Sequence, residues 1–222
     1  MAALTALLAG PAGAPVSPSE QSVSLEVARP PRSTGGAAAR AISASALAVT
    51  LPDGNRARFW PARSLAPPSP PEEGSSPFLR ERVRYRIAPG SLVGVIDFSA
   101  AWTDSRVQAI PAGAYALVYA VQPAIKEHRG VSEIRDVLVL VPAHEFAVSA
   151  GVDSVVAASR RVAGTGHPAV LALLPPPSIP DPPRVVREDG GRLVLEVLAG
   201  GIPMALILSG AANPLQTRGF DR

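Results

Sequence analysis

Six polar residues in the middle of the chain have side chains that could bind a ligand or take part in acid/base chemistry. They are Asp104, Arg106, His128, Arg135, Asp136 and His167, and Gln108 lies in the same stretch of sequence. Carboxylate, guanidinium and imidazole groups that meet at one surface can recognise a polar ligand by charge-assisted hydrogen bonds. The alternative is structural: Asp104 with Arg106, and Arg135 with Asp136, would be ion pairs that stabilise turns.

Other short patterns do not meet the requirements of the chemistry they suggest. Residues 164–169 match the letters G-x-G-x-x-A of a dinucleotide site, but a helix precedes them and a strand follows, which is the reverse of the order that such a site needs. His144-Glu145 begins like a zinc-protease helix, yet Val148 stands at the second histidine position. The chain has no cysteine. The sequence therefore predicts no catalytic residue, no metal site and no cofactor.

Three strands are expected to carry all of these residues except His167 at their ends, with Gln108 beside them; His167 precedes a later strand. Residues 92–98, 114–121 and 136–141 are apolar runs rich in β-branched residues, and the polar residues lie mostly in the connections between them. In residues 114–121, large side chains alternate with small ones, as expected of a face packed on a core and backed by a tighter layer. Connections this short favour antiparallel neighbours.

The remainder of the chain extends the same architecture. Further strands are expected at residues 21–28, 48–51 and 56–60 around an Asp-Gly turn, 83–87, 169–174, 192–198 and 204–208, with one helix at residues 153–163. The sequence predicts a mainly β protein, an antiparallel β-sandwich of immunoglobulin-like or jelly-roll type with one short helix. A single domain is expected over residues 19–211, with proline-rich loops at 61–77 and 175–183 and a disordered tail at 212–222.

Composition narrows the partners and the compartment. The net charge is only +3, and the arginines are dispersed instead of forming a basic face, so no nucleic acid is expected. Residues 1–18 are interpreted as a signal peptide or a disordered tail, because an apolar run precedes small residues. A signal would place the protein in the periplasm or outside the cell, and the alternative is the cytoplasm. No membrane span is expected, since Glu196 and residues 200–203 interrupt the longest other apolar run.

The polar residues also belong to a longer motif run. It has the form D-x-R-x-Q-x-I, P-x-G-x-Y, Q-P, H-x-G-x-S-x-x-R-D, V-P-A and G-T-x-H-P. The matching positions are Asp104, Arg106, Gln108, Ile110, Pro111, Gly113, Tyr115, Gln122, Pro123, His128, Gly130, Ser132, Arg135, Asp136, Val141, Pro142, Ala143, Gly164, Thr165, His167 and Pro168. In this run, residues 92–174 resemble a group of small exported bacterial proteins that have no assigned activity. Residues 124–127 depart from the group, which usually has acidic and glycine residues there.

The resemblance implies an exported β-sandwich and no reaction. Two hypotheses follow. The first is a non-catalytic exported module that binds another envelope protein or a small polar ligand. The alternative is a hydrolase or ligand-processing domain whose site gathers Asp104, Arg106, His128 and His167.

Overall fold

The computed structural model describes residues 24–68, 83–123, 134–148, 150–178, 183–188 and 191–210. The strands are β1 (Ser24–Glu26), β2 (Ala46–Thr50), β3 (Arg56–Pro61), β4 (Leu92–Phe98), β5 (Trp102–Thr103), β6 (Ala109–Ile110), β7 (Gly113–Val121), β8 (Asp136–Pro142), β9 (Val170–Leu174), β10 (Arg184–Arg187), β11 (Leu193–Ala199) and β12 (Ile202–Ser209). The helices are α1 (Gly36–Ala41) and α3 (Val152–Ala163).

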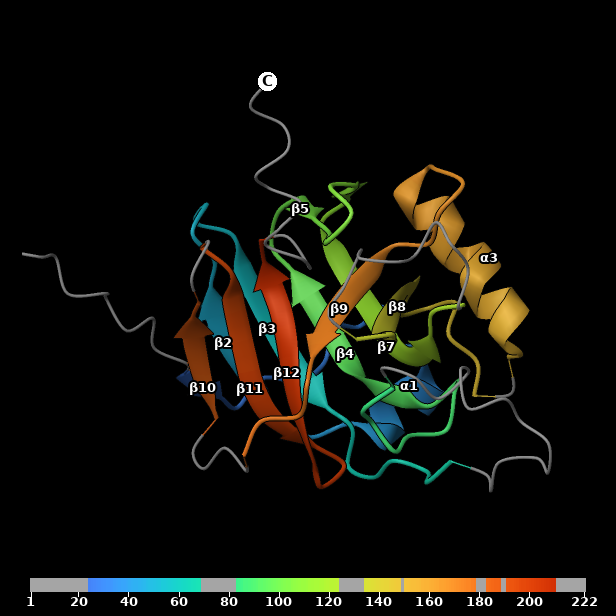
Figure 1. Ribbon diagram of the computed structural model, residues 1–222, viewed down its shortest axis with the longest axis horizontal. Coiled ribbons are helices and arrows are strands. Elements are labelled where there is room, and N and C mark those ends of the chain that lie inside the picture. The colour runs from blue at the N-terminus through green and yellow to red at the C-terminus, as the bar shows by residue number, and fades with distance from the viewer. Residues whose placement is uncertain are drawn as a thin grey trace, which may run out of the picture.

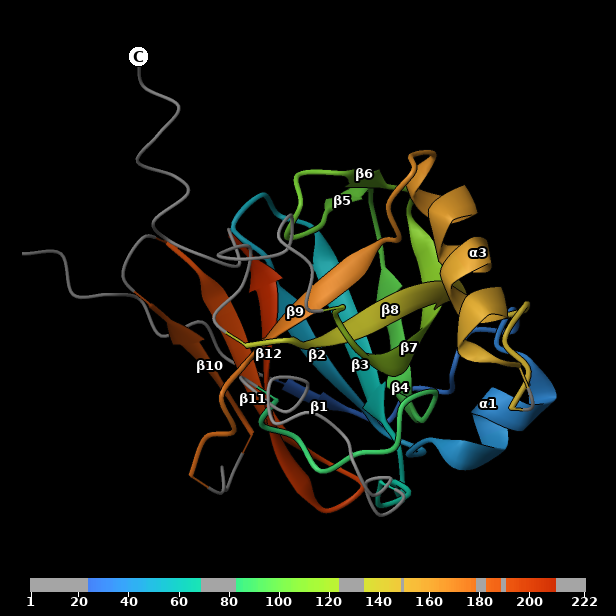
Figure 2. The same ribbon diagram turned by 45° about the vertical axis from the view of Figure 1, so that its right-hand side comes forward.

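One antiparallel sheet dominates the molecule and nearly closes into a barrel (Figures 1 and 2). Its strand order is β1-β2-β3-β4-β7-β8-β9-β12-β11-β10, so β1 and β10 are the two edge strands. Strand β9 joins the two halves, because it pairs with β8 on one side and with β12 on the other. The short strands β5 and β6 form a separate hairpin between β4 and β7.

Two hairpins follow directly from local sequence. Asp53-Gly54 turns the chain between β2 and β3, with Gly54 at a φ of 83° and the Asp53 carboxylate accepting the Asn55 backbone N–H at 2.9 Å. Gly200 and Gly201, at φ values of 56° and 82°, turn the chain between β11 and β12. The hairpin predicted around the Asp-Gly turn is confirmed, and the strands predicted at 192–198 and 204–208 pair as a second hairpin.

The large side chains of the strands fill the interior of the barrel. In β7, Tyr115, Leu117 and Tyr119 point into this core, where they join Phe59 of β3 and Leu206 of β12. The small side chains of β7 point outward instead. The predicted alternation of a large face with a small face is therefore confirmed for this strand.

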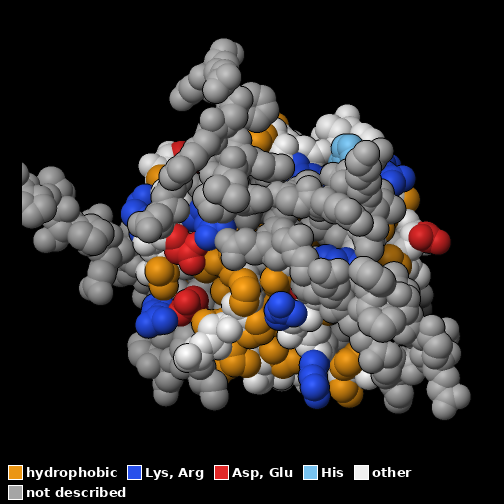
Figure 3. All heavy atoms as spheres, in the orientation of Figure 1, with side chains coloured by type: hydrophobic (Ala, Val, Ile, Leu, Met, Phe, Trp, Pro, Cys, Tyr) orange, Lys and Arg blue, Asp and Glu red, His pale blue; other side chains and the backbone are white. Residues whose placement is uncertain are grey.

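Both helices cover the outer face of the sheet at β3, β4, β7 and β8. Ala38 of α1 and Val155 of α3 pack in one cluster with Trp60, Ala116 and Val139 from the strands beneath. Alanine and valine at these positions let the helices approach the sheet closely. The outer face of β9, β11 and β12 carries its own small apolar cluster, and Figure 3 shows hydrophobic side chains gathered over β11 and β12.

The mainly β, antiparallel fold is confirmed, but the sandwich prediction differs from the structure. Instead of two sheets, each strand of the main sheet is hydrogen-bonded to the next in one continuous, curved sheet. Alternation shows which side chains are buried but not which strands pair, so the sequence did not distinguish the two arrangements. The helix predicted at 153–163 is α3, and α1 was not predicted.

The strand predicted at residues 83–87 is absent. The segment is extended and buries Tyr85 and Ile87, but the backbone N–H groups of Arg84 and Tyr85 bond to the Asp136 carboxylate. These two donors are therefore satisfied by a side chain instead of a neighbouring strand.

Several predicted features lie outside the described residues. They are the N-terminal segment 1–18, the tail 212–222, the start of the strand predicted at 21–28, and parts of the two proline-rich loops. Within the described residues, neither helix is long and apolar enough to cross a membrane.

Candidate functional site

The β5–β6 hairpin is built around the buried carboxylate of Asp104. This side chain is only 3% exposed. Its Oδ1 accepts the backbone N–H groups of Arg106 and Gln108, each at 2.9 Å. An aspartate that accepts from the backbone two residues ahead forms an Asx turn, which fixes the conformation of the following residues. Asp104 therefore shapes the hairpin tip, residues 105–108.

The same carboxylate joins the hairpin to a turn that is distant in sequence. Asp104 Oδ2 accepts the Gln108 side-chain amide at 2.8 Å and the backbone N–H of Val170 at 3.1 Å. The Gln108 amide also donates to the Pro168 carbonyl at 3.1 Å, and the Thr165 hydroxyl donates to Gln108 Oε1. The two ends of the motif run, D-x-R-x-Q and G-T-x-H-P, thus meet in space.

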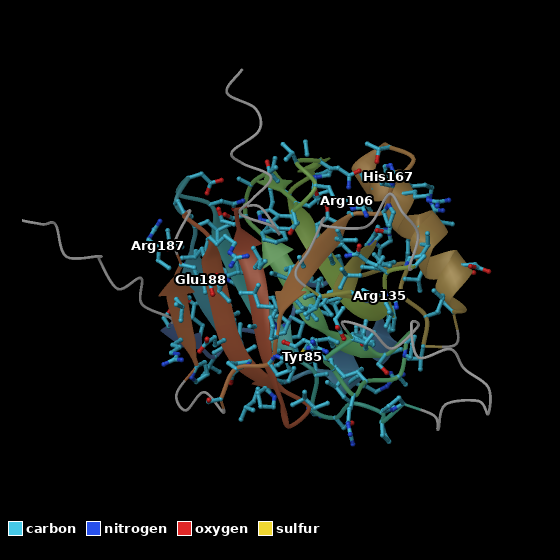
Figure 4. The ribbon with its side chains drawn as sticks, in the orientation of Figure 1. Tyr85, Arg106, Arg135, His167, Arg187 and Glu188 are labelled. Atoms are coloured by element: carbon cyan, nitrogen blue, oxygen red, sulfur yellow. The ribbon has the colours of Figure 1, made fainter. Side chains whose placement is uncertain are left out.

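The end of α3 directs the second of these segments. Gly164 ends the helix in the left-handed conformation, with a φ of 63°, and its N–H bonds to the Arg160 carbonyl at 3.0 Å. The chain then turns through residues 164–168, where the exposed His167 lies, and enters β9. Figure 4 shows Arg106 and His167 in the same upper region of the molecule. We call the hairpin tip (105–108) and the turn (164–168) the hairpin end of the barrel.

Val107 at the hairpin tip has a strained backbone. Its φ is 64°, and no other described residue except glycine has a positive φ. A β-branched side chain at positive φ crowds the backbone and costs about 1–2 kcal/mol. The Val107 side chain is nevertheless 82% exposed, so burial does not offset this cost. The strain is maintained by the hydrogen bonds of Asp104 on either side of Val107.

Replacing Val107 with glycine is expected to raise the free energy of unfolding by about 1 kcal/mol, because glycine adopts positive φ without this crowding. Urea denaturation of the two proteins would measure the change. Val148 is the matched control, since it is also exposed, at 71%, and has no positive φ. Val148→Gly should leave the free energy of unfolding unchanged or lower it. If Val107→Gly and Val148→Gly lowered it equally, the backbone at Val107 would not be strained.

Arg135 and Asp136 lie at the other end of β8 and β9. The Asp136 carboxylate is fully buried, and it accepts the Tyr119 hydroxyl at 2.6 Å in addition to the two backbone N–H groups of residues 84 and 85. Arg135 donates through Nε and Nη2 to the Gln122 carbonyl, at 2.8 and 2.6 Å. Figure 4 shows Arg135 well below Arg106 and His167. The structure therefore divides the five described candidates between two places, and the sixth, His128, lies outside the described residues.

Two buried tyrosines complete the network at Asp136. The Tyr85 hydroxyl donates to the Leu174 carbonyl at 2.8 Å and accepts the Ala205 N–H at 3.1 Å, which links β9 to β12. Burial raises the pKa of both Tyr85 and Tyr119, and the hydrogen bond to Asp136 raises that of Tyr119 further. Both phenols thus stay protonated and able to donate. These tyrosines were not predicted as partners of Asp136; in the β7–β8 register Val121 lies opposite Asp136, and Tyr119 lies two residues before Val121 on β7.

Two shallow hollows flank α3, with volumes of about 320 and 330 Å³. Both are lined by Glu145 and Arg161, whose side chains form an ion pair at 2.6 Å. His144 lines one hollow and lies 3.8 Å from Glu145. The charged groups of these hollows already have partners in one another, so they are weaker candidates for a ligand than the hairpin end.

The hydrogen bonds at Asp104 limit the chemistry of the hairpin end. A general base needs an oxygen that can approach the proton it removes, and both oxygens of Asp104 accept N–H groups inside the protein. Among the described residues, no three side chains of histidine, aspartate or glutamate gather as metal ligands would. The groups left at the surface are Arg106, Val107 and His167, which can form contacts with a partner.

Part of this site could have been found from the sequence. Asp104, Arg106, Gln108 and His167 were singled out, but Val107 and Thr165 were not considered as part of a site. An apolar residue between two polar ones in a turn was the available signal for Val107. A comparison of the chain with family models, curated proteins and solved structures found no match, so the resemblance in the motif run stays a prediction.

Proposed function

We propose that this chain is a non-catalytic binding module that contacts a protein partner through the hairpin end of the barrel. The observation that carries the proposal is Val107, an apolar side chain held in the open at a strained backbone position. Strain of this kind persists only where surrounding structure imposes it, and it gathers at binding and active sites. Here a buried carboxylate with four hydrogen bonds imposes it.

The packing of the barrel supports a contact surface on the outside. Aromatic and aliphatic side chains from β2 to β12 meet in one interior cluster, among them the fully buried Phe59, Phe98 and Tyr119. Some antiparallel barrels bind a ligand in an interior cavity. In this barrel, side chains fill the interior instead. Recognition at loops on a rigid scaffold is the usual alternative.

Export to the periplasm or outside the cell is part of the same proposal. It rests on the apolar run and small residues near the N-terminus and on the resemblance of the motif run to exported proteins. The hydrolase alternative is not favoured by the geometry, because Asp104 is engaged in the structure of the hairpin.

Photo-crosslinking in the cells that naturally contain the protein tests the proposed surface. A benzoylphenylalanine residue in place of Val107 is expected to give a discrete crosslinked species, because a partner seated on the hairpin tip lies within reach. The same probe at Ala109, exposed on β6, keeps the test independent of the strained turn. Val27 and Val148, which are 94% and 71% exposed, serve as control positions away from the tip.

The outcomes separate a specific surface from general exposure. A species found with probes at 107 and 109 but not at 27 or 148 supports the proposal. The same products at all four positions, or none at 107 and 109, would contradict it.

A further inference from the structure

Arg106 differs from the other sheltered arginines of the described chain. Five arginine side chains there are partly or fully buried, namely Arg56, Arg58, Arg106, Arg135 and Arg192. Four of them have a carboxylate or carbonyl partner: Arg56 and Arg58 form ion pairs with Glu26, Arg192 forms one with Glu188, and Arg135 donates to the Gln122 carbonyl. The Arg106 guanidinium has no such partner. Its Nε is buried without a hydrogen bond, as are those of Arg58 and Arg192, but the latter two side chains lie beside a carboxylate.

Only the Nε of the half-buried Arg106 side chain is itself buried, and a buried N–H without an acceptor is energetically unfavourable. Removing a charged or polar group from water costs free energy unless a hydrogen bond replaces the lost water, and nearly all such groups in proteins have a partner. The nearest carboxylate in sequence, Asp104, does not supply it, because it accepts the Arg106 backbone N–H and three further N–H groups. The position therefore favours an acceptor from another molecule.

The surroundings of Arg106 indicate the charge of that acceptor. His167 lies on the neighbouring turn, and Arg160 is exposed in the last turn of α3. Figure 3 shows a histidine and basic side chains along the upper right of this face. Among the residues that the structure describes, the buried Asp104 is the only carboxylate bonded into the hairpin end. A positive guanidinium in this setting favours an oxyanion.

We propose that Arg106 binds a carboxylate in an acidic segment of the protein partner, while an apolar side chain beside that carboxylate contacts Val107. This inference rests on the proposed function and specifies the chemistry of its partner. A guanidinium can hold a carboxylate through two parallel N–H···O bonds, and such contacts are stronger than neutral ones. A turn of the side chain would bring the buried Nε into this pair.

The exposed Val107 side chain favours a protein segment over a free anion as the ligand of Arg106. Phosphate or acetate could occupy Arg106, but phosphate has no apolar group to contact the valine next to it, and acetate has only a methyl group. A segment in which a leucine flanks an aspartate satisfies both residues at once, because burial of apolar surface adds to the ion pair. The adjacent Arg106 and Val107 thus form a two-part recognition element.

Titration of the full-length, isotope-labelled protein, followed by NMR, tests this inference. The probe is the capped pentapeptide Gly-Leu-Asp-Leu-Gly, and its control is Gly-Leu-Asn-Leu-Gly. We expect the aspartate peptide to shift the Arg106 Nε–H and Val107 methyl signals, and the asparagine peptide to bind at least tenfold more weakly. The variant R106Q should lose at least tenfold in affinity, whereas R63Q, which removes the same charge from an exposed arginine outside the hairpin end, should not.

Each remaining outcome bears on one of the two proposals. Equal shifts with acetate or inorganic phosphate alone would assign Arg106 to a small anion and overturn the inference. No shift with either peptide, together with specific crosslinks at Val107, would overturn carboxylate recognition but keep the binding module. Failure of both experiments would remove the proposed function as well.

Discussion

Replacing Asp136 with alanine is expected to lower the free energy of unfolding by about 3–5 kcal/mol, since buried donors left without an acceptor cost about 1–3 kcal/mol each. Three donors would lose their acceptor: the Tyr119 hydroxyl and the backbone N–H groups of Arg84 and Tyr85. Asp136 itself is fully buried, so water does not reach the site without opening the barrel. Urea denaturation at neutral pH would measure the loss.

Two milder variants separate the contributions of individual hydrogen bonds at Asp136 to the stability of the protein. Tyr119→Phe removes a single donor and leaves the carboxylate two backbone partners, so a loss of about 1–2 kcal/mol is expected. Asp136→Asn keeps one oxygen acceptor and should fall between the two. If Asp136→Ala lowered the free energy of unfolding by less than Tyr119→Phe, the network would not be what holds residues 83–87 in place.

Replacing Asp104 with alanine is the second large change, with an expected loss of about 2–4 kcal/mol. The carboxylate accepts three backbone N–H groups and the Gln108 amide, and these belong to the hairpin tip and to the start of β9. Chemical shifts of the Arg106, Gln108 and Val170 amides would report the loss of these bonds directly. The specific crosslinks from positions 107 and 109 should disappear too, because the tip would no longer be held.

Gln108→Ala provides the control for the hairpin. It removes the side-chain bonds to Asp104, Pro168 and Thr165 but leaves the backbone N–H groups bonded to Asp104. We expect a loss of about 1–2 kcal/mol and a tip that keeps its conformation. If Asp104→Ala and Gln108→Ala behaved alike, the backbone bonds to Asp104 would not be what holds Val107 at positive φ.

The sequence predicted well those parts of the fold that depend on local pattern. Alternation identified β4, β7 and β8, and the Asp-Gly pair identified the hairpin after Thr50. Strand pairing depends on contacts between distant residues, so the closure of the sheet through β9 and β12 was not available from these patterns. The same limit explains the segment 83–87, whose hydrogen bonds go to a side chain 51 and 52 residues away.

The candidate site was predicted in part for similar reasons. Residue type identified Asp104 and Asp136 as candidates, but it does not distinguish a carboxylate that binds a ligand from one that binds the backbone. Both carboxylates accept backbone N–H groups, and Asp104 does stabilise a turn. The predicted ion pairs, Asp104 with Arg106 and Arg135 with Asp136, are not among the ion pairs of the described residues, and Arg135 donates to the Gln122 carbonyl. For Asp104 the acceptance is from the Arg106 backbone and not from its guanidinium.

The edge strand β10 bears on how the folded protein behaves at high concentration. Among the described strands, β10 pairs only with β11, so its other edge has backbone groups on which a second copy could form a strand pair. Antiparallel pairing of two copies, centred between Val185 and Val186, would place Arg184 of one copy opposite Arg187 of the other. Like charges directly opposite each other are destabilising. The order Arg-Val-Val-Arg therefore protects this edge against aggregation into extended sheets.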